Sequence, residues 1–337
     1  VGETSRALNW SLYDYDRDTN PELSKIEGVT SFCHVLTESN TTHKSVPMLL
    51  SPVSAQNFDS IYYRKSVITA FKEAGFQTAF FSNQRYNHSF IDFFGMEADT
   101  YDFIKEDSQD SQYNPSDDDL LILVEKELEK GNRKQFIVLH TYGSHFNYRE
   151  RYPETAAFFL PDFPVDAEVK YKDNLMNAYD NSIRYTDNFL ARIIHLLEEQ
   201  QVDAGLLYTS DHGEDIFDDG RHLFLHASPV PSYYQLHVPL LLWTSDSYRE
   251  EYPGIEKAAS MNRQKNISSS ISFFQTMMEL AGIETPYRND SLSVTSPLYT
   301  EKSRVYLNDH NEPRPLDDIG MRKEDFEMLK KRGIDAQ

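Results

Sequence analysis

The sequence is short of positive charge. Its 33 lysines and arginines stand against 54 aspartates and glutamates, which gives a formal net charge of −21. Nucleic-acid binding depends on Lys and Arg side chains that neutralise phosphates, so this balance argues against a nucleic-acid partner. It also disfavours an anionic substrate, unless a local cation such as a bound metal ion reverses the field.

Cysteine and long apolar runs are scarce as well. Cys33 is the single cysteine, which excludes an internal disulfide framework and leaves the compartment open. The longest apolar runs, "LLILV" at 120–124 and "VPLLLW" at 238–243, are far shorter than the ~18 residues that a membrane helix needs. The opening "VGETSR" is typical of a strand end that runs into a turn. We therefore expect residues 1–337 to be one soluble domain, cut from a longer protein whose membrane anchor was removed with the missing part.

What the sequence does contain is a repeated alternation of helix and strand patterns. The spacing of apolar residues predicts helices over 65–75, 118–131, 174–200 and 266–282. Near-continuous apolar runs predict strands over 76–82, 134–141, 204–211 and 237–245. Residues 107–119 are the most polar insertion, and we expect a surface loop there. The alternation predicts an α/β fold with three α/β/α layers, in which helices cover both faces of a mostly parallel sheet.

Polar residues follow several of the predicted strands, at the edge where open α/β sheets bind ligands. Asp211 and His212 stand together at one strand end, and Gly213 allows the backbone to turn sharply after them. The other candidates at strand ends are Glu3, His140, His145, His222 and His226. A lone histidine such as His140 or His237 is more often a surface or core residue. The set of Glu3, Asp211, His212, His145 and His226 nevertheless favours a metal site, with zinc indicated by the imidazoles and manganese as the alternative.

The stretch "ESNTTHKSVP" at 38–47 has two interpretations. It contains an Asn-x-Thr glycosylation sequon at Asn40, and it also places hydroxyl groups just before an apolar run. A metal lowers the pKa of a coordinated hydroxyl, and a helix N-terminus presents free N–H groups to a phosphate. Thr41 or Thr42 would then be a nucleophile toward phosphorus. The stretch alone decides neither between the interpretations nor between the threonines.

Six ordered motifs resemble those of the phosphoethanolamine transferases, including the lipid A modifying enzymes, of the alkaline phosphatase and sulfatase superfamily. They are "VGETSRALNWSLYDYDRDTNPEL" (1–23), "TTHKSVPMLLS" (41–51), "LHTYGSHFNYRERYP" (139–153), "YDNSIRYTDNFL" (179–190), "SDHGED" (210–215) and "FLHASP" (224–229). The resemblance implies an alkaline phosphatase/sulfatase-like fold and one catalytic domain over 1–337, preceded in the whole protein by a membrane anchor.

Carried over by position, the resemblance implies that the zinc ligands are Glu3, Thr42, Asp211 and His212. Thr42 stands three residues before Ser45, which is the place of the family's nucleophile. His145 and His226 would bind the phosphate group or a second zinc, so one or two Zn²⁺ ions are implied. Further candidates are Asn83 or Gln84 for substrate contacts, Lys44 as an assisting cation and His222 as a rival of His226. His43 receives no role.

The implied reaction moves phosphoethanolamine from phosphatidylethanolamine to lipid A, a core sugar or another glycan, through a covalent intermediate on Thr42. The implied location is the bacterial inner membrane with this domain facing the periplasm, where the Asn40 sequon is accidental. The single cysteine departs from the several disulfides of the lipid A enzymes, and Met48 stands where they often have cysteine. Alternatives within the superfamily are glycerol-phosphate transfer resembling lipoteichoic acid synthase, a phosphodiesterase, and a sulfatase. Cys33 lacks the Pro and Arg context of a sulfatase nucleophile. A non-catalytic binding domain is disfavoured because all the expected ligands are present.

Overall fold

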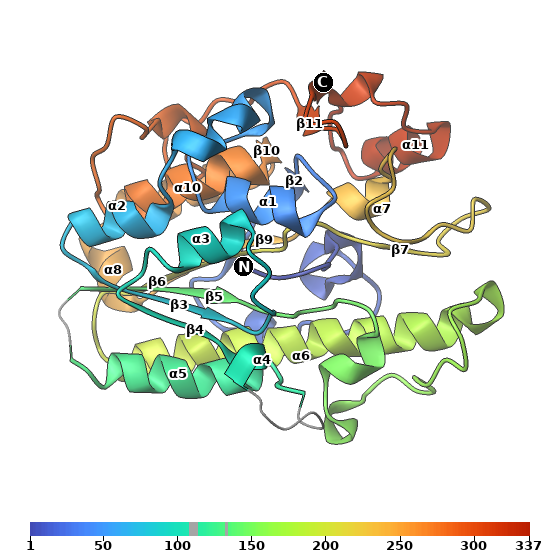
Figure 1. Cartoon of the computed structure of the whole chain (residues 1–337), viewed down its shortest axis with the longest axis horizontal. Helices are drawn as coiled ribbons and strands as arrows, with labels where there is room; N and C mark the ends of the chain where they lie inside the picture. The colour runs from blue at the N-terminus through green and yellow to red at the C-terminus, as the bar shows by residue number, and fades with distance from the viewer. Residues whose placement is uncertain (108–113, 132–133) are drawn as a thin grey trace.

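A central sheet, built from two groups of strands, organises the chain (Figure 1). The structure, a computed structural model, describes residues 1–107, 114–131 and 134–337. In the first group, the strands run parallel in the order β4 (Thr100–Phe103), β3 (Gln77–Ser82) and β5 (Gln135–His140). In the second, β9 (Leu240–Thr244) runs antiparallel to both of its neighbours, β6 (Gly205–Thr209) and β1 (Thr30–Ser31).

Residues 1 and 2 join the two groups of strands. The Val1 nitrogen donates to the Leu139 carbonyl at 2.6 Å, beside β5. The Gly2 N–H donates to the Thr209 carbonyl at 2.8 Å, beside β6. The two groups therefore behave as one sheet, and Glu3 emerges at the carboxyl edge between β5 and β6.

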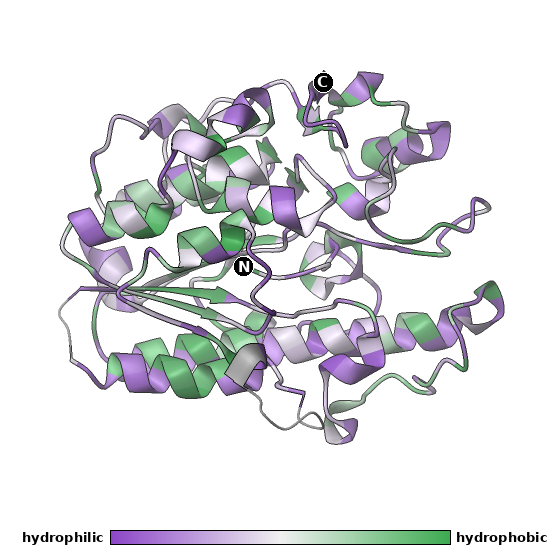
Figure 2. Cartoon of the chain, in the orientation of Figure 1, coloured by the Kyte–Doolittle hydropathy of each residue, from purple (hydrophilic) through white to green (hydrophobic). Residues whose placement is uncertain are grey.

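Both faces of this sheet are apolar, because successive side chains of a strand point to opposite faces. Phe80 of β3 packs into the apolar cluster on one face, and Phe81 packs into the cluster on the other. Leu242 and Trp243 of β9 divide between the two faces in the same way. Figure 2 shows hydrophobic residues along the strands and in the helices that flank them.

Two layers of helices cover these faces (Figure 1). One layer contains α1 (Thr42–Leu49), α2 (Val67–Glu73), α3 (Phe90–Gly95) and α10 (Ser269–Leu280). The other contains α5 (Asp118–Leu128) and α6 (Lys172–Glu199). The remaining helices are α4 (Ile104–Asp107), α7 (Tyr233–Leu236), α8 (Asp246–Glu251), α9 (Pro253–Asn262) and α11 (Lys323–Lys331). The remaining strands pair as β2 (His34–Leu36) with β10 (Asn266–Ser268), β7 (Asp215–Ile216) with β8 (Phe224–Leu225), and β11 (Val305–Leu307) with β12 (Pro313–Pro315).

The three-layer α/β/α fold predicted from the sequence is confirmed, with local differences. The strand predicted over 237–245 begins at Leu240, because Pro239 has no N–H to donate to the ladder. The helix predicted over 266–282 begins at Ser269, because the three residues before it pair with β2. The surface loop predicted over 107–119 lies partly outside the described residues, and its last two residues begin α5. Within 1–107, 114–131 and 134–337, every helix is too short or too polar to cross a bilayer.

The loop after β5 packs directly on the backbone of Glu3. The Ser144 N–H donates to the Glu3 carbonyl at 3.0 Å. Gly143 has a φ of +51°, and a Cβ added to it would lie 2.7 Å from the same carbonyl oxygen. The left-handed backbone and the close contact both require glycine at this position.

We predict that Gly143→Ala lowers the free energy of unfolding by about 3 kcal/mol, because it adds an overlap with Glu3 to the backbone strain. Gly75→Ala is the matched control and should lower it by about 1 kcal/mol. Gly75 has a φ of +84° but nothing within 4 Å of an added Cβ, so its substitution introduces strain alone. Urea unfolding followed by circular dichroism measures both values. Equal losses in the two variants would contradict the overlap.

Candidate metal centre

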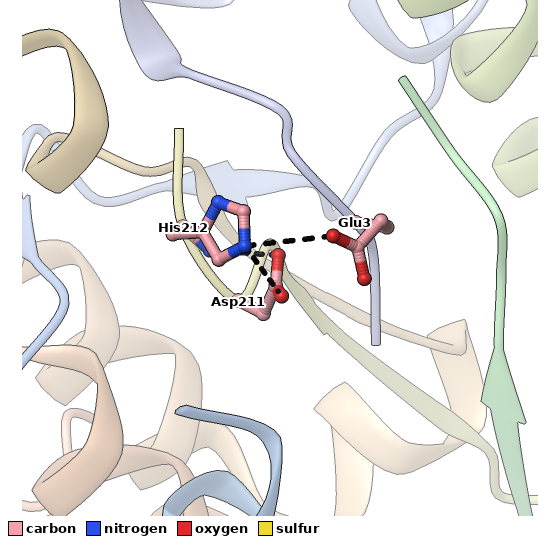
Figure 3. Close-up of side chains that lie close together, drawn as sticks. All are labelled: Glu3, Asp211 and His212. Atoms are coloured by element: carbon pink, nitrogen blue, oxygen red, sulfur yellow. Dashed lines mark hydrogen bonds and ion pairs between the residues drawn. The ribbon is translucent and has the colours of Figure 1, made fainter. Parts of the chain in front are cut away.

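Three potential metal ligands converge at the carboxyl edge of the sheet (Figure 3). Glu3 follows the joining residues, and Asp211 and His212 follow β6. One ligand atom of each lies within 4.8 Å of the others, and all three side chains are buried. His212 Nε2 is 3.2 Å from Asp211 Oδ2 and 3.5 Å from Glu3 Oε1. The fold thus brings together three ligands from two distant parts of the sequence.

Backbone groups fix the orientation of these ligands. Asp211 Oδ1 accepts from the Thr4 N–H at 3.0 Å and from the His212 N–H at 2.7 Å, which leaves Oδ2 for the centre. His212 Nδ1 lies 2.9 Å from the Gly213 carbonyl, so Nδ1 carries the proton and Nε2 presents its lone pair. A Cβ on Gly213 would overlap the Tyr234 carbonyl oxygen, so glycine is required for the turn.

Thr42 adds a hydroxyl group to the centre from the first turn of α1. Its Oγ1 lies 3.0 Å from Glu3 Oε1 and 3.2 Å from His212 Nε2. Thr41 precedes the helix, and its hydroxyl bonds to Ser39 Oγ at 3.2 Å instead. The structure therefore distinguishes two threonines that the local sequence could not. The first N–H groups of α1 also lack an acceptor within the helix, as at every helix N-terminus.

The Asn40 side chain is buried, and its amide group is fully engaged. Its Nδ2 donates to Gln235 Oε1 at 2.6 Å and to the Ser228 carbonyl at 2.9 Å, and its Oδ1 accepts from the Tyr306 hydroxyl at 2.7 Å. A glycan on Asn40 would break these bonds, which supports the interpretation of the sequon as accidental.

The donor set of this centre fits a zinc ion. Asp211 Oδ2 is buried without a hydrogen-bond donor. Burial and the nearby Glu3 carboxylate raise the pKa of Asp211 well above its usual range. Burial and the neighbouring His226 lower the pKa of His212 to about 3, so its ring is neutral. Two carboxylates, a neutral imidazole and the Thr42 hydroxyl supply four ligand atoms to a divalent cation, which would also neutralise the buried charges.

His145 and His226 lie beside the centre. The centre of the His226 ring is 4.3 Å from that of His212 and 5.8 Å from that of His145. His226 Nδ1 bonds to Glu214 Oε1 at 3.1 Å, and His145 Nδ1 bonds to the Phe146 carbonyl at 2.6 Å. Both rings therefore keep Nε2 for a phosphoryl oxygen or a second metal.

Glu214 and Arg6 support His226, and neither was predicted from the sequence. Glu214 Oε2 accepts from the Tyr148 hydroxyl at 2.9 Å, and the Glu214 carbonyl accepts from Arg6 Nη1 at 2.9 Å. Arg6 is buried and also pairs with Asp218 at 2.7 Å. Both residues stand inside motifs that were singled out, "SDHGED" and "VGETSR", but their position relative to His226 depends on the tertiary fold.

Of the two polar residues considered after β3, Gln84 reaches the centre. Its Nε2 donates to Glu3 Oε2 at 2.9 Å. Asn83 Nδ2 instead donates to Asp117 Oδ1 at 2.8 Å and to the Pro115 carbonyl at 3.2 Å. Asn83 thus stabilises a loop, because neighbouring residues at a strand end point in different directions.

Lys44 and His222 do not join the centre. Lys44 stands two residues after Thr42, so it projects from a different side of α1, and its Nζ donates to the Asn308 carbonyl at 2.8 Å. His222 is exposed in the turn between β7 and β8, so His226 is the histidine of this segment that contacts His212. His43 is exposed on the first turn of α1, and the structure gives it no role.

The isolated histidines His140 and His237 are buried. His140 Nδ1 bonds to Ser82 Oγ at 3.1 Å, and burial lowers the pKa of this histidine to about 4. His237 bonds to the Tyr233 hydroxyl at 2.7 Å and to the Cys33 carbonyl at 3.0 Å. His237 is thus a satisfied core histidine, whereas His140 Nε2 is buried without a hydrogen-bond partner.

Comparison with known proteins relates this centre to a family. The Sulfatase family model matches residues 1–283. Phosphoethanolamine transferase EptA of Escherichia coli is 30% identical over 295 residues, which cover 85% of this chain and 53% of the relative. Kdo(2)-lipid A phosphoethanolamine 7''-transferase of Escherichia coli (strain K12) is 26% identical over 300 residues, which cover 85% of this chain and 51% of the relative. The chain thus spans about half the length of the curated relatives it matches.

Two crystal structures of the C-terminal periplasmic domain of EcEptC from Escherichia coli have the same fold. One gives a TM-score of 0.83 at 25% identity and covers 95% of this chain and 92% of that chain. The other, a complex with Zn, gives a TM-score of 0.81 at 25% identity and covers 91% and 87%. The alkaline phosphatase/sulfatase-like fold is therefore confirmed. Because the family model matches most of its length, this chain belongs to the sulfatase family, and its relatives include phosphoethanolamine transferases.

Proposed function

We propose that residues 1–337 are a single catalytic domain of a zinc-dependent phosphoethanolamine transferase. The position of Thr42 carries this proposal. Its Oγ1 lies 3.0 Å from Glu3 Oε1 and 3.2 Å from His212 Nε2, at the start of a helix. A hydroxyl placed among metal ligands and next to free backbone N–H groups is suited to attack phosphorus. Relatives named as phosphoethanolamine transferases support the choice of the transferred group.

The metal in this proposal is one zinc ion, held by Glu3, Thr42, Asp211 and His212. Zinc lowers the pKa of a coordinated hydroxyl and withdraws charge from a phosphoryl group. The zinc complex of the EptC domain supports zinc over manganese. We assign His145 and His226 to bind the phosphoryl oxygens, because their Nε2 atoms remain available beside the centre.

The reaction has two steps at Thr42. In the first, Oγ1 attacks the phosphorus of phosphatidylethanolamine, the bond from phosphorus to the glycerol oxygen breaks, and diacylglycerol leaves with a proton. Phosphoethanolamine is then bonded to Thr42. In the second, an oxygen of the acceptor attacks the same phosphorus, the bond to Oγ1 breaks, and the threonine hydroxyl regains its proton. The α1 N–H groups, His145 and His226 stabilise the phosphoryl charge in both steps.

The acceptor and the location are proposed by similarity to relatives. One relative is named as a Kdo(2)-lipid A phosphoethanolamine transferase, and the two EptC domains are described as periplasmic. We therefore propose lipid A, a core sugar or another envelope glycan as the acceptor. We place the domain on the periplasmic side of the bacterial inner membrane, attached through the part of the relatives that this chain does not span.

The alternative reactions have less support. The lipoteichoic acid synthase LtaP from Listeria monocytogenes is 18% identical, and a 2-O GAG sulfatase is 11% identical, so both likenesses concern the fold alone. At the position of the nucleophile this chain has Thr42, not the modified Cys or Ser of a sulfatase. A phosphodiesterase would pass the same phosphoryl group to water. In the absence of an acceptor, the Thr42 adduct would therefore be short-lived in a phosphodiesterase and long-lived in a transferase.

We predict that the zinc-loaded chain, exposed to phosphatidylethanolamine, carries phosphoethanolamine on Thr42 and releases diacylglycerol. Mass spectrometry of the intact protein and of its peptides measures the adduct. Thr42→Ala should abolish the adduct and lower turnover by about 10³-fold or more, because the nucleophile is removed. Thr41→Ala is the matched control and should keep most of the adduct formation and most of the turnover. An adduct on Thr41, unchanged turnover in Thr42→Ala, or an adduct formed only from phosphatidylglycerol would refute the proposal.

We also predict opposite effects of Asp211→Asn with and without zinc. In the metal-free protein this variant should raise the free energy of unfolding by about 1 kcal/mol, because an amide avoids the cost of raising the pKa of the Asp211 carboxyl on burial beside Glu3. With zinc it should be the less stable protein, because zinc affinity falls by roughly 100-fold. Urea unfolding and titration calorimetry measure the two effects. His226→Ala is the control and should keep one tightly bound zinc; loss of one of two zinc ions there would make His226 a metal ligand.

A further inference from the structure

A loop beside α6 exposes a group of large apolar side chains. Residues 158–165 lie between β5 and α6, and four of their side chains are 57% to 81% exposed, namely Phe158, Leu160, Phe163 and Val165. In the described parts of the chain, no other run of eight residues exposes as many large apolar side chains. We call residues 158–165 the apolar loop. A group of exposed apolar side chains this dense marks a surface that contacts a partner.

Asparagine side chains on one face of α6 bind the backbone of this loop. The asparagines are three and four positions apart in the helix, at Asn174, Asn177 and Asn181. Asn181 accepts from the N–H groups of Phe158 and Phe159 at 3.0 and 2.8 Å, and it donates to the Phe159 carbonyl at 3.0 Å. The other two donate to the carbonyls of Pro161 and Phe163, at 2.8 and 3.3 Å. The backbone of the apolar loop is therefore fixed on the helix.

This pairing of the backbone favours lipid as the partner. In an apolar medium, each backbone polar group without a partner costs free energy, because no water is present to bind it. Five backbone groups of the apolar loop are bound to asparagines of α6, and Pro161 and Pro164 have no N–H to satisfy. A protein surface supplies partners for free backbone groups, whereas the interior of a bilayer supplies none.

Arginine side chains lie against the aromatic rings of the apolar loop. The distances from the guanidinium carbon Cζ to the ring centre are 3.8 Å for Arg17 and Phe159, 4.1 Å for Arg184 and Phe158, and 4.4 Å for Arg149 and Phe163. Each ring thus has a cation beside it. In a bilayer, rings of this kind enter the boundary between headgroups and acyl chains, and the cations stay at the level of the lipid phosphates.

The charges that face outward at two of these rings are positive. Arg17 pairs with Asp180 at 2.7 Å, and Arg149 pairs with Asp162 at 3.2 Å. Both carboxylates are buried, at 0% and 1% exposed, whereas the arginine side chains are 28% and 14% exposed. A lipid phosphate beside the rings would therefore meet guanidinium groups, and its charge is complementary to theirs.

Nearby carboxylates restrict the class of lipid. Asp18 pairs with Arg184 at 3.4 Å, Glu168 pairs with Lys170 at 3.0 Å, and Asp166 is exposed. Together with the net charge of −21, these acids would be repelled by a strongly anionic membrane surface. The apolar loop therefore suits a surface of zwitterionic phospholipid, in which each phosphate is accompanied by an ammonium group.

The position of the apolar loop relates it to the metal centre. Asn181, which binds the loop, is followed by Ser182, whose hydroxyl donates to Ser144 Oγ at 2.9 Å. Ser144 directly precedes His145, one of the histidines beside the centre. In Figure 1, the segment that leads into α6 lies beyond the carboxyl ends of β3 and β5, on the side of the sheet where the centre is. A bilayer that meets the apolar loop would therefore place its headgroups on that side.

We propose that the apolar loop is a membrane-docking surface, which inserts Phe158, Leu160, Phe163 and Val165 into a bilayer of zwitterionic phospholipid. This inference rests on the proposed transferase function, because phosphatidylethanolamine is itself a zwitterionic lipid of such a bilayer. Docking allows the headgroup of the donor to reach Thr42 while its acyl chains stay in the bilayer. The cost of moving two acyl chains into water is thereby avoided.

The first experiment compares two forms of the donor in Phe158→Ser/Phe163→Ser. One form is long-chain phosphatidylethanolamine in phosphatidylcholine vesicles, and the other is short-chain phosphatidylethanolamine dissolved as monomers. The rate of Thr42 adduct formation from vesicles should fall about tenfold, because two phenyl rings no longer leave water on docking. The rate from dissolved donor should change less than about twofold, because the loop does not touch the metal centre.

A matched control removes exposed apolar side chains from the opposite end of α6. Val202 follows that helix and Tyr252 follows α8, and both side chains are about half exposed. Val202→Ser/Tyr252→Ser should leave the rate unchanged with both forms of the donor. An unchanged rate from vesicles in Phe158→Ser/Phe163→Ser, or an equal loss with both forms, would overturn the apolar loop as a docking surface.

The second experiment measures insertion without any reaction. The zinc-loaded chain carries Cys33→Ser, a fluorophore on Val165→Cys and a histidine tag before residue 1, which tethers it to nickel-chelating lipid in phosphatidylcholine vesicles. Tethering supplies a high effective concentration at the surface. Lipids with brominated acyl chains should quench this label about twofold, because the loop reaches the acyl boundary. A label on Tyr252→Cys is the control and should stay unquenched.

The two experiments distinguish failure of the docking surface from failure of the proposed function. If no adduct forms from either donor but the label on Val165→Cys is quenched, the transferase proposal fails and the docking surface stands. If the adduct forms, the label stays unquenched and Phe158→Ser/Phe163→Ser reacts with vesicles as wild type does, the docking surface fails alone.

Discussion

The repulsion between two buried carboxylates, those of Glu3 and Asp211, is the constraint around which the site is built. Charges this close cannot both persist in a medium of low dielectric unless a cation lies between them. The fold nevertheless fixes both. The Glu3 backbone is held between the joining residues and the loop after β5, and Asp211 is held by the Thr4 N–H. A neutral His212 and the Thr42 hydroxyl add two further ligand atoms, and the buried Asp211 Oδ2 has no hydrogen-bond donor, so the set suits a divalent cation.

The same constraint explains how an acidic chain can handle phosphate. At physiological ionic strength, salt screens exposed charges over about 8 Å, so the net charge of the distant surface acts only weakly at the site. Local charges decide the field there. Arg6 donates to the Glu214 carbonyl, and Lys105 and Arg151 lie over the ring of Tyr142, which stacks on His145. A metal ion at the centre and these cations at its rim would make a short positive path within a negative protein.

Much of this arrangement could be predicted from the sequence, and the parts that could not have a common reason. The strands, the three layers and the position of Glu3, Asp211 and His212 at strand ends follow from local patterns, since parallel strands bring their carboxyl ends to one edge. Which of two adjacent side chains reaches the centre is set by backbone direction, and no local pattern reports it. Gln84 rather than Asn83, and Thr42 rather than Thr41, are such cases.

Contacts between segments that lie far apart in the sequence could not be predicted either. Lys44 neighbours Thr42 in the sequence, but its Nζ donates to the carbonyl of Asn308, which is 264 residues away in the chain. Arg6 and Glu214 lie in recognised motifs, yet their support of His226 depends on a bond between segments about 200 residues apart. β9 runs antiparallel within the sheet, and its apolar residues carry no signal of strand direction. Composition and periodicity identify the buried faces of helices and strands and the ends of strands, whereas the contact partners of a side chain are set by the tertiary fold.

The geometry of displacement at phosphorus explains why groups outside the metal centre must choose the acceptor. The attacking and leaving oxygens lie roughly in line across the phosphorus. In the proposed reaction, Thr42 Oγ1 occupies one end of that line in both steps, so the glycerol oxygen and the acceptor oxygen occupy the other end in turn. The zinc ligands, His145 and His226 meet the same phosphoryl group each time and cannot tell the two partners apart. Discrimination must therefore come from contacts farther out.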